Sequence, residues 1–282
     1  MKYGKLTLTA LLGAASLLGS ASFSVLAQEP EPSMHPYLDR SHLFLVGAYF
    51  QDVKAEIRET RGPLPQQAVN FGHLGVDETD TSLHLEYRFR ISERWGLLAA
   101  AQRFSGQGTR GNVRAFNFGS VQFPVGAELH SKLDVDTYIL DVVYTTYRSQ
   151  RAEFAIGVGI HAFDFATKIE GRKVAGQNDS SDSIAFEELL APLPNLRLQG
   201  FYAINSRWAV SGSLGWMSAN VDEWSGDFLY LNGRLQYLFA NSFGMALGYQ
   251  FTDVDVSREQ NRRQSEYDME FSGPSLHLSY GF

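Results

Sequence analysis

The sequence has no cysteine, fewer basic than acidic residues, and no long hydrophobic run beyond its first 27 residues. The absence of cysteine excludes a disulfide scaffold, a thiolate metal site and a cysteine nucleophile. Lys and Arg number 24 against 31 Asp and Glu, and this balance argues against a face that binds nucleic acid. After Ala27, no stretch approaches the roughly 18 apolar residues that a membrane helix requires. The chain is therefore not a bundle of membrane helices.

The first residues have the pattern of an export signal. Lys2 and Lys5 precede an apolar run over residues 6–18, and a small residue, Ala27, closes the segment. This pattern predicts a signal peptide over residues 1–27 that is removed after export. Residues 28–41, which are rich in proline, predict a flexible N-terminal lead-in, and residues 42–282 the folded domain. Such an exported body is either soluble or crosses a membrane as a closed β-barrel.

Alternation of apolar and polar residues dominates residues 42–282. In residues 83–91, apolar side chains alternate with charged ones, and only a strand places all the apolar groups on one face. The same alternation predicts strands over 43–57, 83–91, 95–104, 138–144, 154–160, 196–204, 208–216, 229–239, 243–251 and 276–282. In the first of these, the expected apolar face consists of Leu43, Leu45, Tyr49, Val53 and Ile57.

The connections between these strands are of two kinds. Four are tight and polar, around residues 92–94, 148–151, 205–207 and 240–242, which is typical of turns. Most of the others are long, over about 60–80, 105–132, 172–188 and 258–265, and one, around 222–227, is short. Pairing the strands across the tight turns gives ten, an even number as bacterial single-chain barrels require. The fold class is therefore an all-β, transmembrane, antiparallel up-and-down β-barrel of ten strands, with eight strands as the alternative.

Aromatic residues flank every tight turn. Amphipathic rings are favoured where hydrocarbon meets lipid headgroups, so these positions predict a membrane-interface girdle. Its members are Phe89, Trp95, Tyr147, Phe154, Tyr202, Trp208, Phe239 and Phe243. The alternative is cross-strand aromatic packing in a soluble sheet.

The chain ends on an aromatic residue within an alternating strand. Leu276, Leu278, Tyr280 and Phe282 resemble the C-terminal assembly signal of Gram-negative outer-membrane β-barrel proteins, and Pro274 departs from it. The resemblance implies the outer membrane of a Gram-negative bacterium, with tight turns in the periplasm and long loops outside the cell. It also implies outer-membrane lipid and lipopolysaccharide as surroundings, and periplasmic chaperones and the barrel-assembly machinery as partners during biogenesis. We expect a monomer. The pattern matches no functionally defined family.

The strand faces opposite the apolar ones carry charged residues that are expected to point into the lumen. This lumen charge network comprises His84, Glu86, Arg88, Arg90, Asp141, His161, Arg197, Arg234 and His277. One interpretation is structural, because a barrel of this size can be filled by side chains alone. The other is a selective pore whose arginines attract small anions.

An enzyme is a further alternative. Acidic and histidine residues are expected near the loop end, namely His73, Asp77, Glu78, His130, Asp164 and Asp222. The omptin proteases are also ten-stranded, with acidic residues and a histidine at the rim, but no pair here matches an omptin motif. His277 and Ser279 superficially resemble the His-x-Ser arrangement of lipid A deacylases. Neither comparison assigns a catalytic residue, and no motif predicts a metal ion or a cofactor.

These observations give one leading hypothesis and two alternatives. The leading one is an integral outer-membrane barrel with a largely filled polar lumen and long extracellular loops, acting in envelope structure or surface interaction. The first alternative is a narrow, porin-like channel for small, anionic solutes. The second is an outer-membrane hydrolase, either a protease or an enzyme that modifies lipid A.

Overall fold

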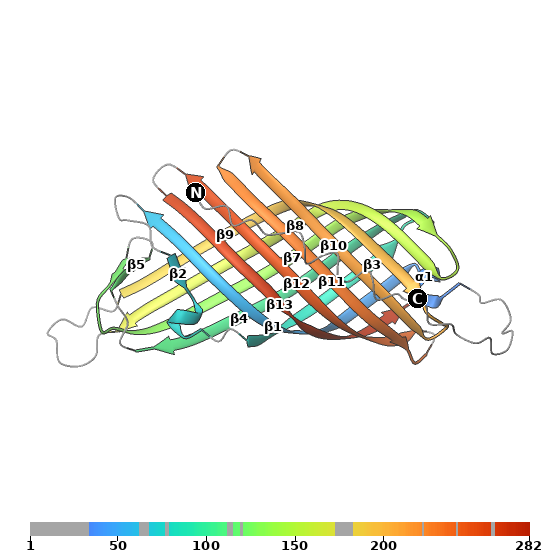
Figure 1. Ribbon diagram of the computed structural model, residues 1–282, viewed down its shortest axis with the longest axis horizontal. Helices are drawn as coiled ribbons and strands as arrows, with labels where there is room; N and C mark the ends of the chain where they lie inside the picture. The colour runs from blue at the N-terminus through green and yellow to red at the C-terminus, as the bar shows by residue number, and fades with distance from the viewer. Residues whose placement is uncertain are drawn as a thin grey trace, which may run out of the picture. The chain divides into compact units, whose positions relative to one another are not determined.

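A computed structural model of the chain describes residues 34–61, 68–76, 79–111, 115–118, 121–172, 183–221, 223–240, 242–260 and 263–282. Within these residues, ten long antiparallel strands form a closed barrel (Figure 1). The strands are β1 (His42–Arg61), β3 (Thr79–Arg90), β4 (Trp95–Arg110), β7 (Glu128–Arg148), β8 (Ala152–Arg172), β9 (Ser183–Ala203), β10 (Trp208–Val221), β11 (Trp224–Leu238), β12 (Phe243–Gln260) and β13 (Arg263–Gly281). The predicted ten-stranded antiparallel barrel is confirmed.

The barrel closes between its first and last strands. β1 pairs with β13 from Leu43 opposite Gly281 to Arg61 opposite Arg263, so neither the first nor the last strand is an edge strand. The pairing is interrupted opposite Gly273 and Pro274, because proline has no N–H to donate to a neighbouring strand. Pro274 still has a register partner on β12, Tyr249.

The strands are longer, and their connections shorter, than the sequence pattern predicts. β7, β8 and β9 each have 21 residues, whereas about 9–11 residues suffice to cross a bilayer. The connection expected over 258–265 is mostly strand, since β12 runs to Gln260 and β13 begins at Arg263. The expectation of long loops is therefore corrected, since the loops are shorter than predicted. The strands extend because the alternation of polarity continues beyond the predicted strand ends.

Short elements occupy the remaining loop regions. β2 (Ala68–Asn70) pairs with β1, and a 3-10 helix, η1 (Gly72–Leu74), follows it. β5 (Phe116–Phe118) and β6 (Val121–Phe123) form a separate two-stranded sheet within the connection expected over 105–132. β2 and β5 lie at the end of the barrel opposite the C-terminus (Figure 1).

The predicted flexible lead-in is partly helical. The signal peptide predicted over 1–27 and residues 28–33 lie outside the described residues. Of the rest, α1 (Pro36–Asp39) forms one turn of helix at the same end as the C-terminus (Figure 1). The side chains of His35 and Leu38 are buried, so this part of the lead-in packs against the barrel. No helix among the described residues is long and apolar enough to cross a membrane.

Next to the tight turns, the outer surface of the wall is apolar. Its side chains point away from the lumen and are about half exposed; Leu140, for example, is 54% exposed. We call this zone the outer belt, and it includes Phe50, Leu85, Leu140, Val158, Leu198, Val210, Leu235, Leu247 and Leu278. The side chains that alternate with these residues along each strand point into the barrel, where they are buried and mostly polar, as the alternation predicts.

Farther from the tight turns, the polarity of the wall reverses. There the interior is an apolar core, which includes Val53, Ile57, Phe104, Phe165, Phe228, Tyr267 and Phe271. The exterior carries charged groups that pair across strands, such as Lys54 with Glu270 at 2.9 Å. This part resembles a soluble barrel, because water is the solvent that suits its outer face.

The reversal corrects two expectations. The lumen is not polar throughout, since its polar part is confined to the section inside the outer belt. The apolar face expected for the first strand, which includes Tyr49 and Ile57, points inward. Val46 and Phe50 lie on the outer face instead. β1 is apolar on both faces near its start, so alternation alone does not orient it.

Carboxylates form a row across the outer wall beyond the outer belt. Asp227 is opposite Asp255, Asp255 opposite Asp268, and Asp268 opposite Glu56. Like charges directly opposite one another destabilise a sheet. Partial desolvation, followed by repulsion from neighbouring carboxylates, Asp268 first, raises the pKa of Asp255 to about 6.

We predict that Asp255→Asn stabilises the barrel at pH 8 and has little effect near pH 4. The unfolded Asp has a pKa of about 3.9, so the folded state binds more protons between these values and loses stability as pH rises from about 4 to about 6. Because the side chain is exposed, salt should weaken the effect. Urea unfolding at both pH values measures it. Asp52→Asn is the control, since the strand partners of Asp52 are Ser272 and Thr79; an equal gain there would contradict the prediction.

Candidate functional site

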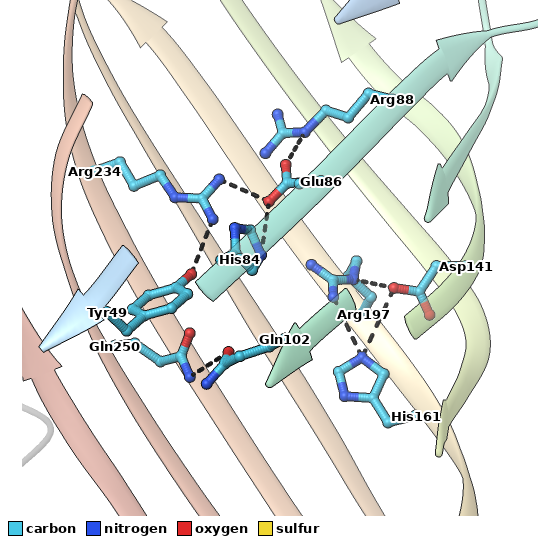
Figure 2. A network of polar contacts seen from close by, with 10 residues as sticks. All are labelled: Tyr49, His84, Glu86, Arg88, Gln102, Asp141, His161, Arg197, Arg234 and Gln250. Atoms are coloured by element: carbon cyan, nitrogen blue, oxygen red, sulfur yellow. Dashed lines mark hydrogen bonds and ion pairs between the residues drawn. The ribbon is translucent and has the colours of Figure 1, made fainter. Parts of the chain in front are cut away.

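The interior of the belt section contains a buried ion-pair cluster centred on Glu86. Arg234 donates to the Glu86 carboxylate at 2.8 Å, and Arg88 donates to its other oxygen at 2.6 Å. Arg234 also donates to the hydroxyl of Tyr49 at 3.1 Å. These side chains come from β1, β3 and β11 and point toward one another (Figure 2). Because each charge has an opposite charge within hydrogen-bond distance, the lumen can hold them away from bulk water.

Two histidines complete this cluster through ring contacts. The ring of His84 lies 5.0 Å from that of His277 and 5.0 Å from that of Tyr49. The Nε2 atom of His84 is 4.0 Å from the Glu86 carboxylate, beyond hydrogen-bond distance. The histidines therefore fill space beside the ion pair and make no hydrogen bond to Glu86.

A second cluster surrounds Asp141. Its carboxylate accepts hydrogen bonds from Arg197 and, at 3.0 Å, from Asn195. A nitrogen of Arg197 lies 3.4 Å from Nε2 of His161. A guanidinium only donates, so a hydrogen bond between them requires Nε2 as the acceptor; the same Nε2 lies 3.9 Å from the Asp141 carboxylate. The guanidinium of Arg197 also lies over the ring of Tyr230, at 5.5 Å.

Glycines next to these side chains make the close packing possible. A Cβ at Gly159 would lie 2.0 Å from the carboxylate of Asp141. A Cβ at Gly47 would lie 2.7 Å from the ring of His277. Glycine at these inward-facing positions leaves the space that the larger polar side chains of neighbouring strands occupy.

Amide side chains line the lumen where the ion-pair clusters give way to the apolar core. Gln51 accepts from Ser82 at 2.7 Å and from Gln102 at 2.9 Å. Gln250 reaches Gln102 at 3.4 Å (Figure 2). Neutral amides exchange hydrogen bonds without the cost of burying a charge, which suits a layer next to hydrophobic side chains, although Nε2 of Gln51 has no partner among the described residues.

At the tight-turn end, α1 lies across the mouth of the lumen. The hydroxyl of Tyr37 is 2.5 Å from that of Ser279, and the backbone N–H of His35 donates to Gln150 at 3.1 Å. Arg148 donates to the carbonyl of Leu38. The helix therefore contacts inward-facing or turn residues on different sides of the barrel and acts as a plug.

A third ion-pair cluster lies beside the plug. Arg90 donates to Glu153 at 2.8 Å, and Arg148 approaches the same carboxylate oxygen at 3.6 Å. These three groups come from β3, β8 and β7. They join the plug to the wall, because Arg148 contacts both Glu153 and α1.

Little space remains between these layers. A cavity of ≈ 70 Å³ lies between α1 and the wall. A second, of ≈ 20 Å³, lies between the polar clusters and the apolar core, and a third, of ≈ 30 Å³, is lined by residues that include Arg88, Glu153 and Asn232. One water needs about 10–15 Å³ measured in this way, so these cavities hold a few waters and no larger solute.

The nine charged residues predicted for the lumen thus fall into three separate groups. His84, Glu86, Arg88, Arg234 and His277 form the first group; Asp141, His161 and Arg197 form the second; and Arg90 belongs to the third. Residues that the sequence analysis did not single out include Glu153, Gln51 and the plug residue Tyr37, and it placed Tyr49 on the apolar face of the first strand rather than in this network. An inward glutamate next to a tight turn, as at Glu153, is a signal that could have been read from the alternation.

The predicted girdle residues lie on the outer surface next to the tight turns, and seven of the eight are exposed: Trp95, Tyr147, Phe154, Tyr202, Trp208, Phe239 and Phe243. Phe89 is half-buried and stacks on His42 at 4.9 Å. Leu276, Leu278, Tyr280 and Phe282 also point outward. Their contact with lipid headgroups and their part in assembly stay predictions.

The residues considered for catalysis do not come together where the structure describes them. His73 is exposed on η1, and His130 and Asp164 point out of the barrel wall. Nε2 of His130 is 3.4 Å from Glu128 on the same strand, and Nδ1 is 2.9 Å from the Thr109 hydroxyl. Asp77, Glu78 and Asp222 lie outside the described residues. Among the described residues, no group of three or more His, Asp or Glu could hold a metal ion.

Comparison with solved structures identifies the class of fold. The chain is similar to the outer membrane protease OmpT from Escherichia coli, with a TM-score of 0.56 and 10% identity over 90% of this chain and 99% of that one. OprG, an outer membrane protein from Pseudomonas aeruginosa, has a TM-score of 0.35 and 14% identity over 86% of this chain and 97% of that one. No protein-family model matches, and no curated protein is significantly similar in sequence. The likeness to OmpT shows a fold of the outer-membrane β-barrel type.

We predict that Glu86→Gln destabilises the barrel by about 3–5 kcal/mol, because it leaves the charge of Arg234 buried without its partner. The side chains of Arg234 and Glu86 are 2% and 5% exposed. Arg88 contacts the same carboxylate but is 31% exposed, so Arg88→Gln should cost less than about 1 kcal/mol.

Urea unfolding in lipid vesicles measures both changes. The double variant Glu86→Gln/Arg234→Met should recover most of the stability, since no unpaired charge remains buried. Equal losses for Glu86→Gln and Arg88→Gln would show that burial does not decide the strength of this cluster.

Proposed function

We propose that this protein is an integral outer-membrane barrel whose closed interior makes it a structural or surface-interaction protein rather than a conduit. Three successive layers support this proposal: the plug formed by α1, the buried ion-pair clusters and the apolar core. The observation that carries it is the small volume of the cavities among the described residues, ≈ 70 Å³, ≈ 20 Å³ and ≈ 30 Å³. A solute would have to displace one of these layers to pass.

The proposed location rests on the outer belt and on the predicted export signal. An apolar band with an ion-paired interior suits hydrocarbon outside and polar groups inside. In this arrangement the tight turns face the periplasm. The part of the wall beyond the belt projects from the cell, with water outside and the apolar core inside. The projecting part is then the surface that partners outside the cell meet.

Leu140→Arg should destabilise the protein in lipid by about 2–4 kcal/mol, the usual cost of an arginine near the bilayer midplane. Leu140 faces outward between Ala99 and Ile160. Gln107→Arg is the matched control, because Gln107 is exposed on the projecting part of β4. Unfolding in vesicles, followed by tryptophan fluorescence, compares the two. Similar costs at both positions would count against a belt in contact with lipid.

Planar-bilayer conductance tests the closed interior. The full-length mature chain should give no single-channel steps, whereas a general porin in the same bilayers should give them. A variant without residues 28–40 should also give no single-channel steps, because the Glu86 cluster and the apolar core remain.

The narrow-channel alternative makes the opposite prediction. Reproducible steps from the unaltered protein, with a size or anion selectivity that shifts in Arg88→Gln, would overturn the proposal. Arg88→Gln is preferred to Arg234→Gln for this purpose, because Arg88 is partly exposed and its loss should not unfold the barrel.

A further inference from the structure

Three of the four tight turns share one construction. In each, a Ser or Asn stands two residues before an Arg: Ser92 with Arg94, Ser149 with Arg151, and Asn205 with Arg207. The side-chain oxygen of the first residue accepts from the backbone N–H of the Arg, at 3.4, 3.4 and 2.9 Å respectively. It also accepts from the next N–H, at 3.1, 3.0 and 2.8 Å. Such side-chain turns fix the backbone locally.

Each of these arginines is also anchored to the neighbouring hairpin. The carbonyl of Arg94 accepts from Thr145, that of Arg151 from Ala203, and that of Arg207 from Leu238, at 2.7, 2.7 and 2.8 Å. The three backbones therefore occupy equivalent places around the tight-turn end of the barrel. In the fourth turn, the carbonyl of Ser242 makes the same contact, with Gly281 at 2.9 Å. Ser242 is thus the equivalent position without a charge.

The three guanidinium groups are open to a ligand. All three residues are exposed, and none makes an ion pair with a carboxylate among the described residues. Arg94 donates to the hydroxyl of Tyr144 at 2.8 Å, which leaves its remaining donors free to bind. The connecting residues 91–94, 149–151, 204–207 and 239–242 contain one acidic residue, Glu93. The tight-turn end is therefore locally basic in a chain of net charge -7.

Aromatic residues set the depth of these arginines. Trp95 and Trp208 directly follow Arg94 and Arg207 in sequence and are exposed on the outer wall. Tryptophan is favoured at the level of the lipid headgroups. An arginine one residue nearer the end of the barrel then lies at the level of the phosphates, which its fork of donors matches.

We propose that Arg94, Arg151 and Arg207 form a phosphate-binding ring for anionic phospholipid in the leaflet that the tight turns contact. This inference rests on the proposed membrane location and adds a lipid partner to it. A basic side chain near an anionic membrane contributes about 1 kcal/mol. Each arginine should therefore favour an anionic over a zwitterionic phospholipid about fivefold.

Quenching of tryptophan fluorescence by brominated lipid tests the ring. The chain has four tryptophans, and Trp216→Phe/Trp224→Phe leaves the two beside the ring. This protein is reconstituted into phosphatidylcholine vesicles that contain a small, equal fraction of either brominated phosphatidylglycerol or brominated phosphatidylcholine. Brominated phosphatidylglycerol should quench more strongly, and high salt should reduce the difference because it screens exposed charges.

Variants at the equivalent turn positions supply the matched controls. Arg94→Gln/Arg151→Gln/Arg207→Gln should abolish the preference for phosphatidylglycerol, and Ser242→Arg should increase it. Trp95→Phe/Trp208→Phe/Trp224→Phe leaves Trp216 alone, on the far side of the outer belt, and this reporter should not respond to the arginine changes. Circular dichroism checks that each variant retains the barrel.

The outcomes separate this inference from the proposed location. Equal quenching by the two brominated lipids, or a preference that survives the triple substitution, would overturn the ring and leave the membrane location intact. Quenching by neither lipid would overturn the membrane location and the ring with it.

Discussion

The rest of the structure depends on one constraint, namely that the two faces of a strand alternate while the solvent outside the barrel changes along its length. In the section of the wall that carries the outer belt, apolar side chains such as Leu140 point outward. The residues that alternate with them must therefore fill the lumen with polar groups. Beyond the belt the exterior is charged, and residues such as Phe104 and Phe228 fill the interior instead. The same wall thus has two opposite arrangements, and each is stable only if a different medium surrounds it.

The polar section must be filled in a particular way. A narrow barrel leaves little room for water, so a charge placed in it needs a partner within the lumen. Glu86 is shared by Arg88 and Arg234, and Asp141 is held by Arg197 and Asn195. Charges that were arranged to attract a passing solute would have donors left over along a continuous path. Here each of these carboxylates is bound by a cation within its own cluster, which favours cohesion of the wall over conduction.

Sequence alone predicted the parts of the fold in which the two faces differ chemically. Residues 83–91 alternate apolar and charged groups, and β3 has the predicted orientation. The predicted orientation of β1 was wrong. Val46 and Phe50 are as apolar as Leu45 and Tyr49, so alternation does not show which face of this strand points outward. The plug was missed because one turn of helix has no periodicity to detect. Partners within the lumen, such as Arg234 for Glu86, depend on register between strands far apart in sequence, which no local pattern encodes.

The two edges of the outer belt carry different charged groups, and in the proposed membrane location this limits how deep the barrel can sit. At one edge, Arg94 and Arg207 stand next to the exposed tryptophans. At the other, Asp255 and Asp268 belong to a row of carboxylates. Movement of the barrel along the membrane normal in either direction would bring one of these sets into hydrocarbon, where each charge costs roughly 2–4 kcal/mol for a basic residue and less for an acidic one. At both edges of the outer belt, burying a charge in hydrocarbon therefore opposes movement of the barrel. Only the arginine edge also attracts the lipid phosphates. Because carboxylates repel an anionic surface that arginines attract, the two edges also differ in which leaflet suits them, independently of any assembly signal.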